Sequence, residues 1–93
     1  MARATDLQLL GNRLEALIAS EPTDNSGLSQ WYLEAHQLRE EIIAKPDLSN
    51  AVPHAVWHYL SDADIRLKDV RYALLQRKEI DEIVAILKRG QRP

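Results

Sequence analysis

The stretch His54–Arg89, HAVWHYLSDADIRLKDVRYALLQRKEIDEIVAILKR, decides the fold of this chain. It contains neither Gly nor Pro, so nothing in its composition forces a helix to stop. Its apolar residues recur at spacings of three and four, which places them on one face of a helix; a strand would alternate at every second residue. An all-helical protein is therefore expected. This first apolar stripe consists of Val56, Leu60, Ala63, Leu67, Val70 and Leu74.

The apolar pattern changes direction after Leu74. The first stripe would continue at Arg77 and Asp81, which are charged, and one straight helix facing one neighbour cannot bury two stripes. A break near residues 68–70, with Asp69 as the N-cap of a new helix, is therefore expected. One long helix that serves two neighbours is the alternative. The second stripe consists of Ala73, Ile80, Ile83, Val84 and Leu87.

The N-terminal part of the chain predicts a helix with one unusual residue. Thr5 and Gln8 have the spacing of a capping box, and Pro22 follows the end of the apolar pattern. Gly11 lies within the apolar face, where Gly costs about 1 kcal/mol relative to Ala. Another backbone or a bulky ring is expected to approach it closely, and simple tolerance of Gly is the alternative.

The remaining segments complete the predicted architecture. Apolar residues of the segment 28–44 also repeat at helical spacing, whereas Glu21–Gly27 and Pro46–Val52 are rich in turn residues and predict loops. We expect one domain, residues 1–93, that folds as a small antiparallel bundle of four helices. The predicted helices span residues 6–19, 28–44, 53–67 and 70–89.

Composition limits the classes of protein that fit. The chain has 93 residues and no Cys, which excludes a disulfide scaffold and a thiolate metal site. No segment approaches the ~20 apolar residues of a membrane span, and residues 1–6 lack the apolar run of a signal peptide. We therefore expect a cytoplasmic protein without a membrane partner.

Charge is distributed unevenly along the chain. Residues 1–64 contain 4 basic and 10 acidic side chains, while residues 65–93 contain 8 basic and 4 acidic ones. A regulator that binds nucleic acid through its basic C-terminal helix is one alternative function. The overall net charge of -2 and the absence of a helix-turn-helix spacing make nucleic acid an unlikely partner.

Catalytic signatures are missing from the sequence, so we expect neither an enzyme nor a cofactor. The chain has no Gly-x-Ser-x-Gly turn, no Gly-rich phosphate loop and no His-Glu-x-x-His motif. His54, His58 and Asp62 follow one another at four-residue spacing, which would place two imidazoles and a carboxylate on one helix face. They are the weak candidates for a metal site, and ordinary surface residues would show the same spacing.

The best functional hypothesis from the sequence is a small interaction or regulatory protein of the adaptor type. Apolar residues outside the main stripes of the second and fourth predicted helices favour self-association as a dimer, and a protein partner is also compatible. Asp64 and Arg66 flank the first stripe and are candidates for a polar contact. Of the two Trp residues, we expect at most one in an interface. The candidate interface residues are Trp31, Tyr32, Ile43, Asp64, Arg66, Tyr72, Leu75 and Ile86.

Overall fold

The helical class predicted from the sequence is confirmed. A computed structural model describes residues 2–93, and no strand occurs among them. These residues form six α-helices and one short 3-10 helix: α1 (Ala4–Ala19), η1 (Asn25–Gly27), α2 (Leu28–Ile43), α3 (Pro46–Ala51), α4 (His54–Ser61), α5 (Ala63–Lys68) and α6 (Val70–Lys88).

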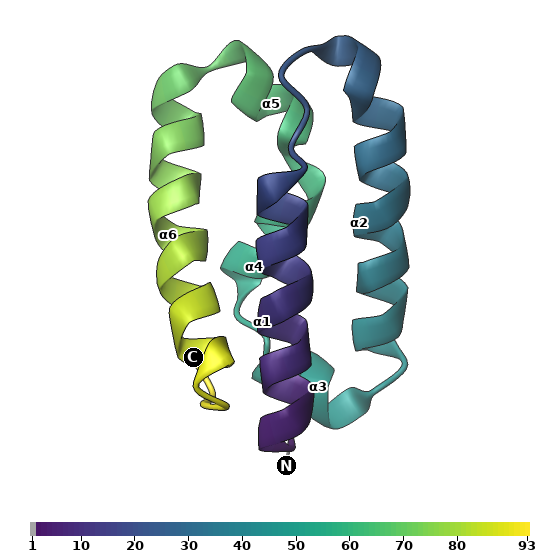
Figure 1. Cartoon of the computed structure of the whole chain (residues 1–93), viewed down its shortest axis with the longest axis vertical. Coiled ribbons are helices and arrows are strands. Elements are labelled where there is room, and N and C mark those ends of the chain that lie inside the picture. Colours follow the sequence, from purple (N-terminus) through teal and green to yellow (C-terminus); the bar gives the residue numbers. More distant parts are fainter. Residues whose placement is uncertain (1) are drawn as a thin grey trace.

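Three long helices, α1, α2 and α6, give the molecule its elongated shape of 37 × 23 × 19 Å (Figure 1). The chain ascends in α1, descends in α2, returns through α3, α4 and α5, and descends again in α6. The most extensive contact between helices joins α1 and α6, and α4 contacts both α2 and α6. The short helices therefore take the place of one long helix.

A single apolar core lies between these helices. Each long helix contributes one stripe at helical spacing, as expected for amphipathic helices around a shared core. Among the largest fully buried side chains are Trp31 from α2 and Tyr59 from α4. The other large, fully buried members are Leu14, Ile42, Val56, Ile80 and Leu87.

The structure has six α-helices among the described residues where four were predicted, and two local features explain the difference. Residues 46–52 do not form the predicted loop, because Pro46 starts the short helix α3 at a position where its missing N–H is not needed. The predicted helix 53–67 is interrupted at Asp62, whose φ of -111° and ψ of 19° separate α4 from α5.

The expected break at Asp69 is confirmed. Asp69 has extended backbone angles, φ -131° and ψ 102°, and its carboxylate accepts a hydrogen bond from the backbone N–H of Tyr72 at 3.1 Å. It is thus the N-cap of α6. The predicted capping box at Thr5 and Gln8 is wrong, because α1 already begins at Ala4 and has no side-chain cap.

Gly11 lies in the contact between α1 and the end of α6. A Cβ atom added at this position would lie 3.0 Å from Cγ of Lys88, 3.1 Å from Cβ of Leu87 and 3.1 Å from the backbone N of Lys88. The predicted close approach of another backbone is therefore confirmed. It explains why Gly occupies this position although Gly weakens an isolated helix.

Replacement of Gly11 by Val should destabilise the protein by about 2 kcal/mol, because the added methyl groups overpack the contact between α1 and α6. Gly11→Ala should have a much smaller effect, since better helix propensity opposes the tight contact. Urea unfolding followed by circular dichroism measures both. Ala16→Val is the matched control, because this exposed position of α1 changes helix propensity alone. An equal loss in Gly11→Val and in the control would contradict the prediction.

Candidate interaction surface

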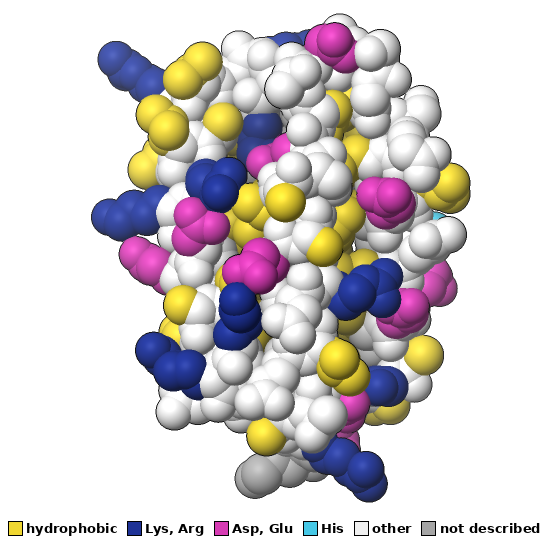
Figure 2. All heavy atoms as spheres, in the orientation of Figure 1, with side chains coloured by type: hydrophobic (Ala, Val, Ile, Leu, Met, Phe, Trp, Pro, Cys, Tyr) yellow, Lys and Arg dark blue, Asp and Glu magenta, His cyan; other side chains and the backbone are white. Residues whose placement is uncertain are grey.

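The first two turns of α6 expose large apolar side chains to solvent. Val70, Leu74 and Leu75 are 74%, 66% and 69% exposed. Figure 2 shows hydrophobic side chains gathered over the upper part of α6, with Lys and Arg side chains around them. Single exposed apolar residues are ordinary on protein surfaces, but a contiguous group marks a candidate interaction site.

The break at Asp69 explains why these side chains point outward. The sequence pattern assigned Val70 and Leu74 to the same buried stripe as Val56, Leu60 and Ala63, and that assignment is wrong for both residues. Val56, Leu60 and Ala63 are buried, whereas the helix that restarts after Asp69 turns its second stripe to the core. Its buried apolar residues are Ile80, Ile83, Val84 and Leu87.

Two cations bracket the exposed leucines. Arg71 precedes Leu74 and Leu75 by three and four residues, and Lys78 follows them at the same distances, so all four side chains share one helix face. Within residues 2–93, neither Arg71 nor Lys78 has an ion-pair partner. We call the residues Val70, Arg71, Leu74, Leu75 and Lys78 the outward α6 face.

A pocket of about 270 Å³ opens beside this face, and we call it the α5–α6 pocket. It is lined by α5, by α6 and by the segment that follows α1. Leu74 belongs both to the pocket and to the outward α6 face. Most of the wall is apolar, and two guanidinium groups and one carboxylate complete it. The lining residues are Glu21, Pro22, Ala63, Arg66, Leu67, Ala73, Leu74 and Arg77.

A buried polar network supports the pocket from below. Only 6% of the Arg66 side chain is exposed. Its Nε donates to Glu21 at 2.7 Å, and one Nη donates both to the Tyr59 carbonyl at 2.8 Å and to Gln76 at 2.7 Å. The guanidinium carbon also lies 4.1 Å from the centre of the Tyr59 ring and 5.3 Å from that of Trp31. Arg66 thus joins four helices and the segment that follows α1.

The network continues to Asp62, which holds the start of α6 against the α4–α5 junction. The Asp62 carboxylate accepts hydrogen bonds from the Tyr72 hydroxyl at 2.5 Å and from the Gln76 amide at 2.9 Å. The bond to Asp62 raises the pKa of the Tyr72 hydroxyl. Burial raises the pKa of Tyr59, with the negative charge of Glu21 acting in the same direction. Both tyrosines therefore remain neutral at physiological pH.

Two of the predicted interface residues are core residues. Trp31 is 2% exposed, and its indole N–H donates to the Leu17 carbonyl at 3.0 Å. Arg66 is engaged in the buried network, although the sequence suggested a contact at the surface. Trp31 is therefore a core residue and not an interface residue, whereas Arg66 reaches the exterior only through the wall of the pocket described above.

The other predicted interface residues lie on several sides of the molecule. Tyr32 donates to Asp64 at 2.6 Å, so this pair connects α2 to α5 within the chain, and the bond lowers the pKa of Asp64. Leu75 and Ile43 are exposed, but they lie on α6 and α2, at opposite edges of the molecule (Figure 1). Tyr72 and Ile86 are partly exposed.

The metal candidates from the sequence do not form a site. α4 ends at Ser61, so Asp62 is not on the helix that carries His54 and His58. Its carboxylate instead holds Tyr72 and Gln76, as described above. Across residues 2–93, no three His, Cys, Asp or Glu side chains come together in a group that could hold a metal ion.

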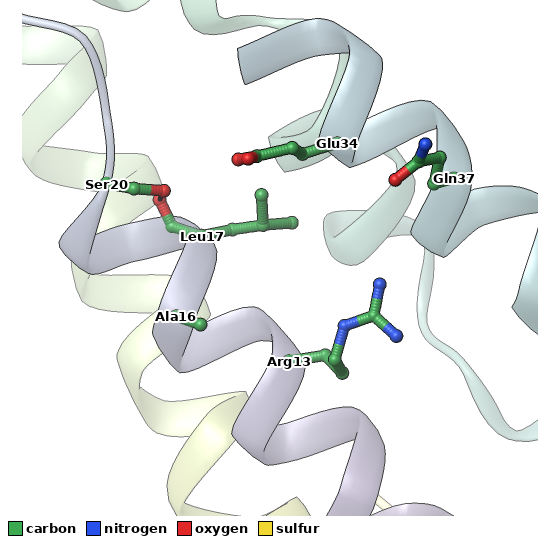
Figure 3. A pocket seen from close by; sticks show the side chains of 6 residues that line it. All are labelled: Arg13, Ala16, Leu17, Ser20, Glu34 and Gln37. Carbon is green, nitrogen blue, oxygen red and sulfur yellow. Dashed lines mark hydrogen bonds between the residues drawn. The ribbon is translucent and has the colours of Figure 1, made fainter. Parts of the chain in front are cut away.

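A second concave region lies between α1 and α2. This pocket has a volume of about 420 Å³. Figure 3 shows Arg13, Ala16, Leu17 and Ser20 on one side of it and Glu34 and Gln37 on the other. The Arg13 guanidinium is paired with Glu41 across the two helices. Because this positive charge is already compensated, the pocket is a weaker candidate for a charged ligand than the outward α6 face.

Comparisons with known proteins provide no relative for this chain. It matches no protein-family model, no curated protein and no solved structure. Among its described helices, none has the length and apolar character needed to cross a membrane.

Proposed function

We propose that this protein is a non-enzymatic interaction module that binds another protein through the outward α6 face. The observation that carries the proposal is the exposure of Val70, Leu74 and Leu75 on two adjacent helical turns. Burying such side chains against a partner provides about 25 cal/mol for each Å² of apolar area removed from water. The α5–α6 pocket beside Leu74 would accept one anchoring side chain of the partner.

The polar side chains of the chain support a structural role rather than catalysis. The Ser20 and Ser61 hydroxyls donate to backbone carbonyls one turn earlier in their helices. The most buried charge, Arg66, is held by four elements of the fold and forms part of the pocket wall. These groups have the functions expected of residues that stabilise a helical domain.

Self-association is the alternative use of the outward α6 face. In an antiparallel pairing of two copies centred on Leu74 and Leu75, Arg71 of one protomer would approach Lys78 of its partner, and a parallel pairing in register would bring identical cations together. Like charges in contact disfavour such a dimer. The exposed residues Leu33 and Ile43 of α2 lie at the opposite edge, so they cannot extend this face within one protomer.

Nucleic-acid binding through the basic C-terminal helix remains the other alternative. The centre of the outward α6 face is occupied by Leu74 and Leu75, which cannot bind phosphate. Such a surface is less suited to a phosphate backbone than a continuous stripe of cations.

Photo-crosslinking in the producing cells tests the proposed function. A photo-reactive phenylalanine analogue at position 75 should give a crosslinked product, because Leu75 is at the centre of the proposed contact. The same analogue at Leu33, which is 54% exposed on α2, is the matched control and should give little. Leu74→Glu should lower the crosslinking yield at position 75 by about tenfold, because it places a charge in the proposed contact. Helicity should be retained, because Leu74 is exposed and not part of the core.

The mass of the product separates the alternatives. We expect a mass that is not a multiple of 10.6 kDa, which indicates a different protein. A product of twice 10.6 kDa would replace the proposed partner by a second copy. Equal yields at positions 75 and 33, or no effect of Leu74→Glu, would refute the proposal that this face is the binding surface.

A further inference from the structure

Charge identifies the kind of protein that fits the outward α6 face. From Val70 to Lys78, α6 contains three cations and no carboxylate, although the whole chain has a net charge of -2. Two of these cations, Arg71 and Lys78, are exposed and have no ion-pair partner within residues 2–93. The third, Arg77, is paired with Asp81 at 3.0 Å. Glu79 and Glu82 follow Lys78 in the next turn, so the positive charge of the face is confined to Arg71 and Lys78, on either side of the apolar centre.

Its dimensions match one face of another α-helix. Arg71 and Lys78 are seven residues apart, which corresponds to about 10 Å along α6 at about 1.5 Å per residue. Leu74 and Leu75 occupy the turn between them. A helix with apolar side chains on one turn and carboxylates one turn on either side would satisfy both the leucines and the two cations.

We propose that the partner presents an acidic amphipathic helix to the outward α6 face, with an apolar side chain in the α5–α6 pocket. This inference rests on the proposed function and adds the chemistry of the partner. Pro22, Ala63, Leu67 and Ala73 form the apolar part of the pocket wall, so an aliphatic side chain fits there. The carboxylates of the helix would pair with Arg71 and Lys78 at the rim.

The other occupants fit the same observations less well. A second copy paired about Leu74 and Leu75 would oppose like charges. An anionic lipid surface would attract Arg71 and Lys78, but binding of that kind depends on a long apolar helix face, and here three apolar side chains occupy only two turns. An acidic helix uses the apolar side chains, the cations and the pocket together.

A pair of synthetic helices tests the proposal. One fluorescent peptide of 18 residues carries Leu at positions a and d of each heptad and Glu at the flanking positions, and its twin has Lys in place of each Glu. The full chain should bind the acidic peptide at least tenfold more tightly than the basic twin at low ionic strength, by fluorescence anisotropy. The preference should decrease as salt is added, because exposed charges are screened.

Matched variants locate the contact. Arg71→Glu with Lys78→Glu should abolish or reverse the preference for the acidic peptide. Arg3→Glu with Arg39→Glu changes the net charge equally, at exposed positions of other elements, and should preserve the preference. Leu74→Glu with Leu75→Glu should weaken binding of the acidic peptide by at least tenfold.

The outcomes separate the two proposals. Equal binding of both peptides that still depends on Leu74 and Leu75 would leave the docking face in place and refute the acidic partner. Binding that is unchanged in the Leu74→Glu, Leu75→Glu variant would also refute the proposal that this face is the docking surface. Tighter binding to vesicles with anionic lipid than to the acidic peptide, lost in the Arg71 and Lys78 variant, would replace the helix by a lipid surface.

Discussion

Replacement of Arg66 by Ala should lower the free energy of unfolding by about 3–5 kcal/mol, the cost expected when one partner of a buried, hydrogen-bonded charge pair is removed. The substitution breaks the contacts of Arg66 with Glu21, Gln76 and the Tyr59 carbonyl, and it removes the guanidinium from the Tyr59 ring. The total free energy of unfolding of a natural domain is only about 5–15 kcal/mol. Urea unfolding monitored by circular dichroism would therefore show a large fall of the midpoint.

Arg77→Ala is the matched control for Arg66→Ala. Arg77 also lines the α5–α6 pocket and forms an ion pair, but its side chain and that of Asp81 are each about half exposed. Removal of such a surface pair costs about 0–1 kcal/mol. Similar losses in the two variants would mean that the Arg66 network contributes no more than a surface ion pair.

The Arg66→Met variant separates packing from charge. Methionine fills part of the same volume next to Tyr59 but cannot satisfy Glu21 or Gln76. We expect a smaller loss than in Arg66→Ala, because the cavity is smaller. Adding Glu21→Gln to Arg66→Met should cost less than the Glu21→Gln substitution alone, since no buried guanidinium is then left without its carboxylate.

Replacement of Trp31 by Ala should also destabilise the protein by about 3–5 kcal/mol, the usual range for removal of a buried Trp. The indole is almost completely buried and lies edge-on to the rings of Tyr32 and Tyr59, with centroid distances of 5.7 Å in both cases. Its N–H also satisfies the Leu17 carbonyl near the end of α1. Thermal and urea unfolding would measure the combined loss.

Two comparison variants interpret the Trp31 result. Trp57→Ala removes the same side chain from α4 at a partly exposed position and should cost clearly less. Trp31→Phe keeps an aromatic ring but cannot donate a hydrogen bond to the Leu17 carbonyl. Its free energy of unfolding should therefore lie between those of the wild type and Trp31→Ala. A larger effect for Trp57→Ala than for Trp31→Ala would contradict the assignment of Trp31 to the core.

Local features of the fold were predictable from the sequence because they depend on neighbouring residues. Helical spacing identified α1, α2 and α6 to within about two residues, an error typical of helix boundaries. The cap at Asp69 and the close approach at Gly11 were also anticipated. Helix α3 was not, because its six residues are too few to show a helical period and contain Pro, Ser and Asn.

The polar network and the exposed leucines could not be predicted in the same way. The sequence made Arg66 a candidate for a polar contact at the surface, but its carboxylate partner is Glu21, 45 residues away. Helical spacing placed Leu74 in the stripe of Val56 and Leu60, although a break at Asp69 was also predicted. The breaks at Asp62 and Asp69 rotate α6, so Leu74 faces solvent. The competing second stripe, from Ala73 to Leu87, was the only signal for this rotation.

The pairing of α1 with α6 determines when the chain can finish folding. Glu15 and Lys88, which form an ion pair between these helices, are separated by 73 residues. At synthesis rates of about 5–20 residues per second, α1 leaves the ribosome several seconds before its main neighbour exists. Throughout that interval the side of α1 that packs against α6 stays exposed to solvent. The contact between α1 and α6 thus stabilises the folded protein, but it can form only at the end of synthesis.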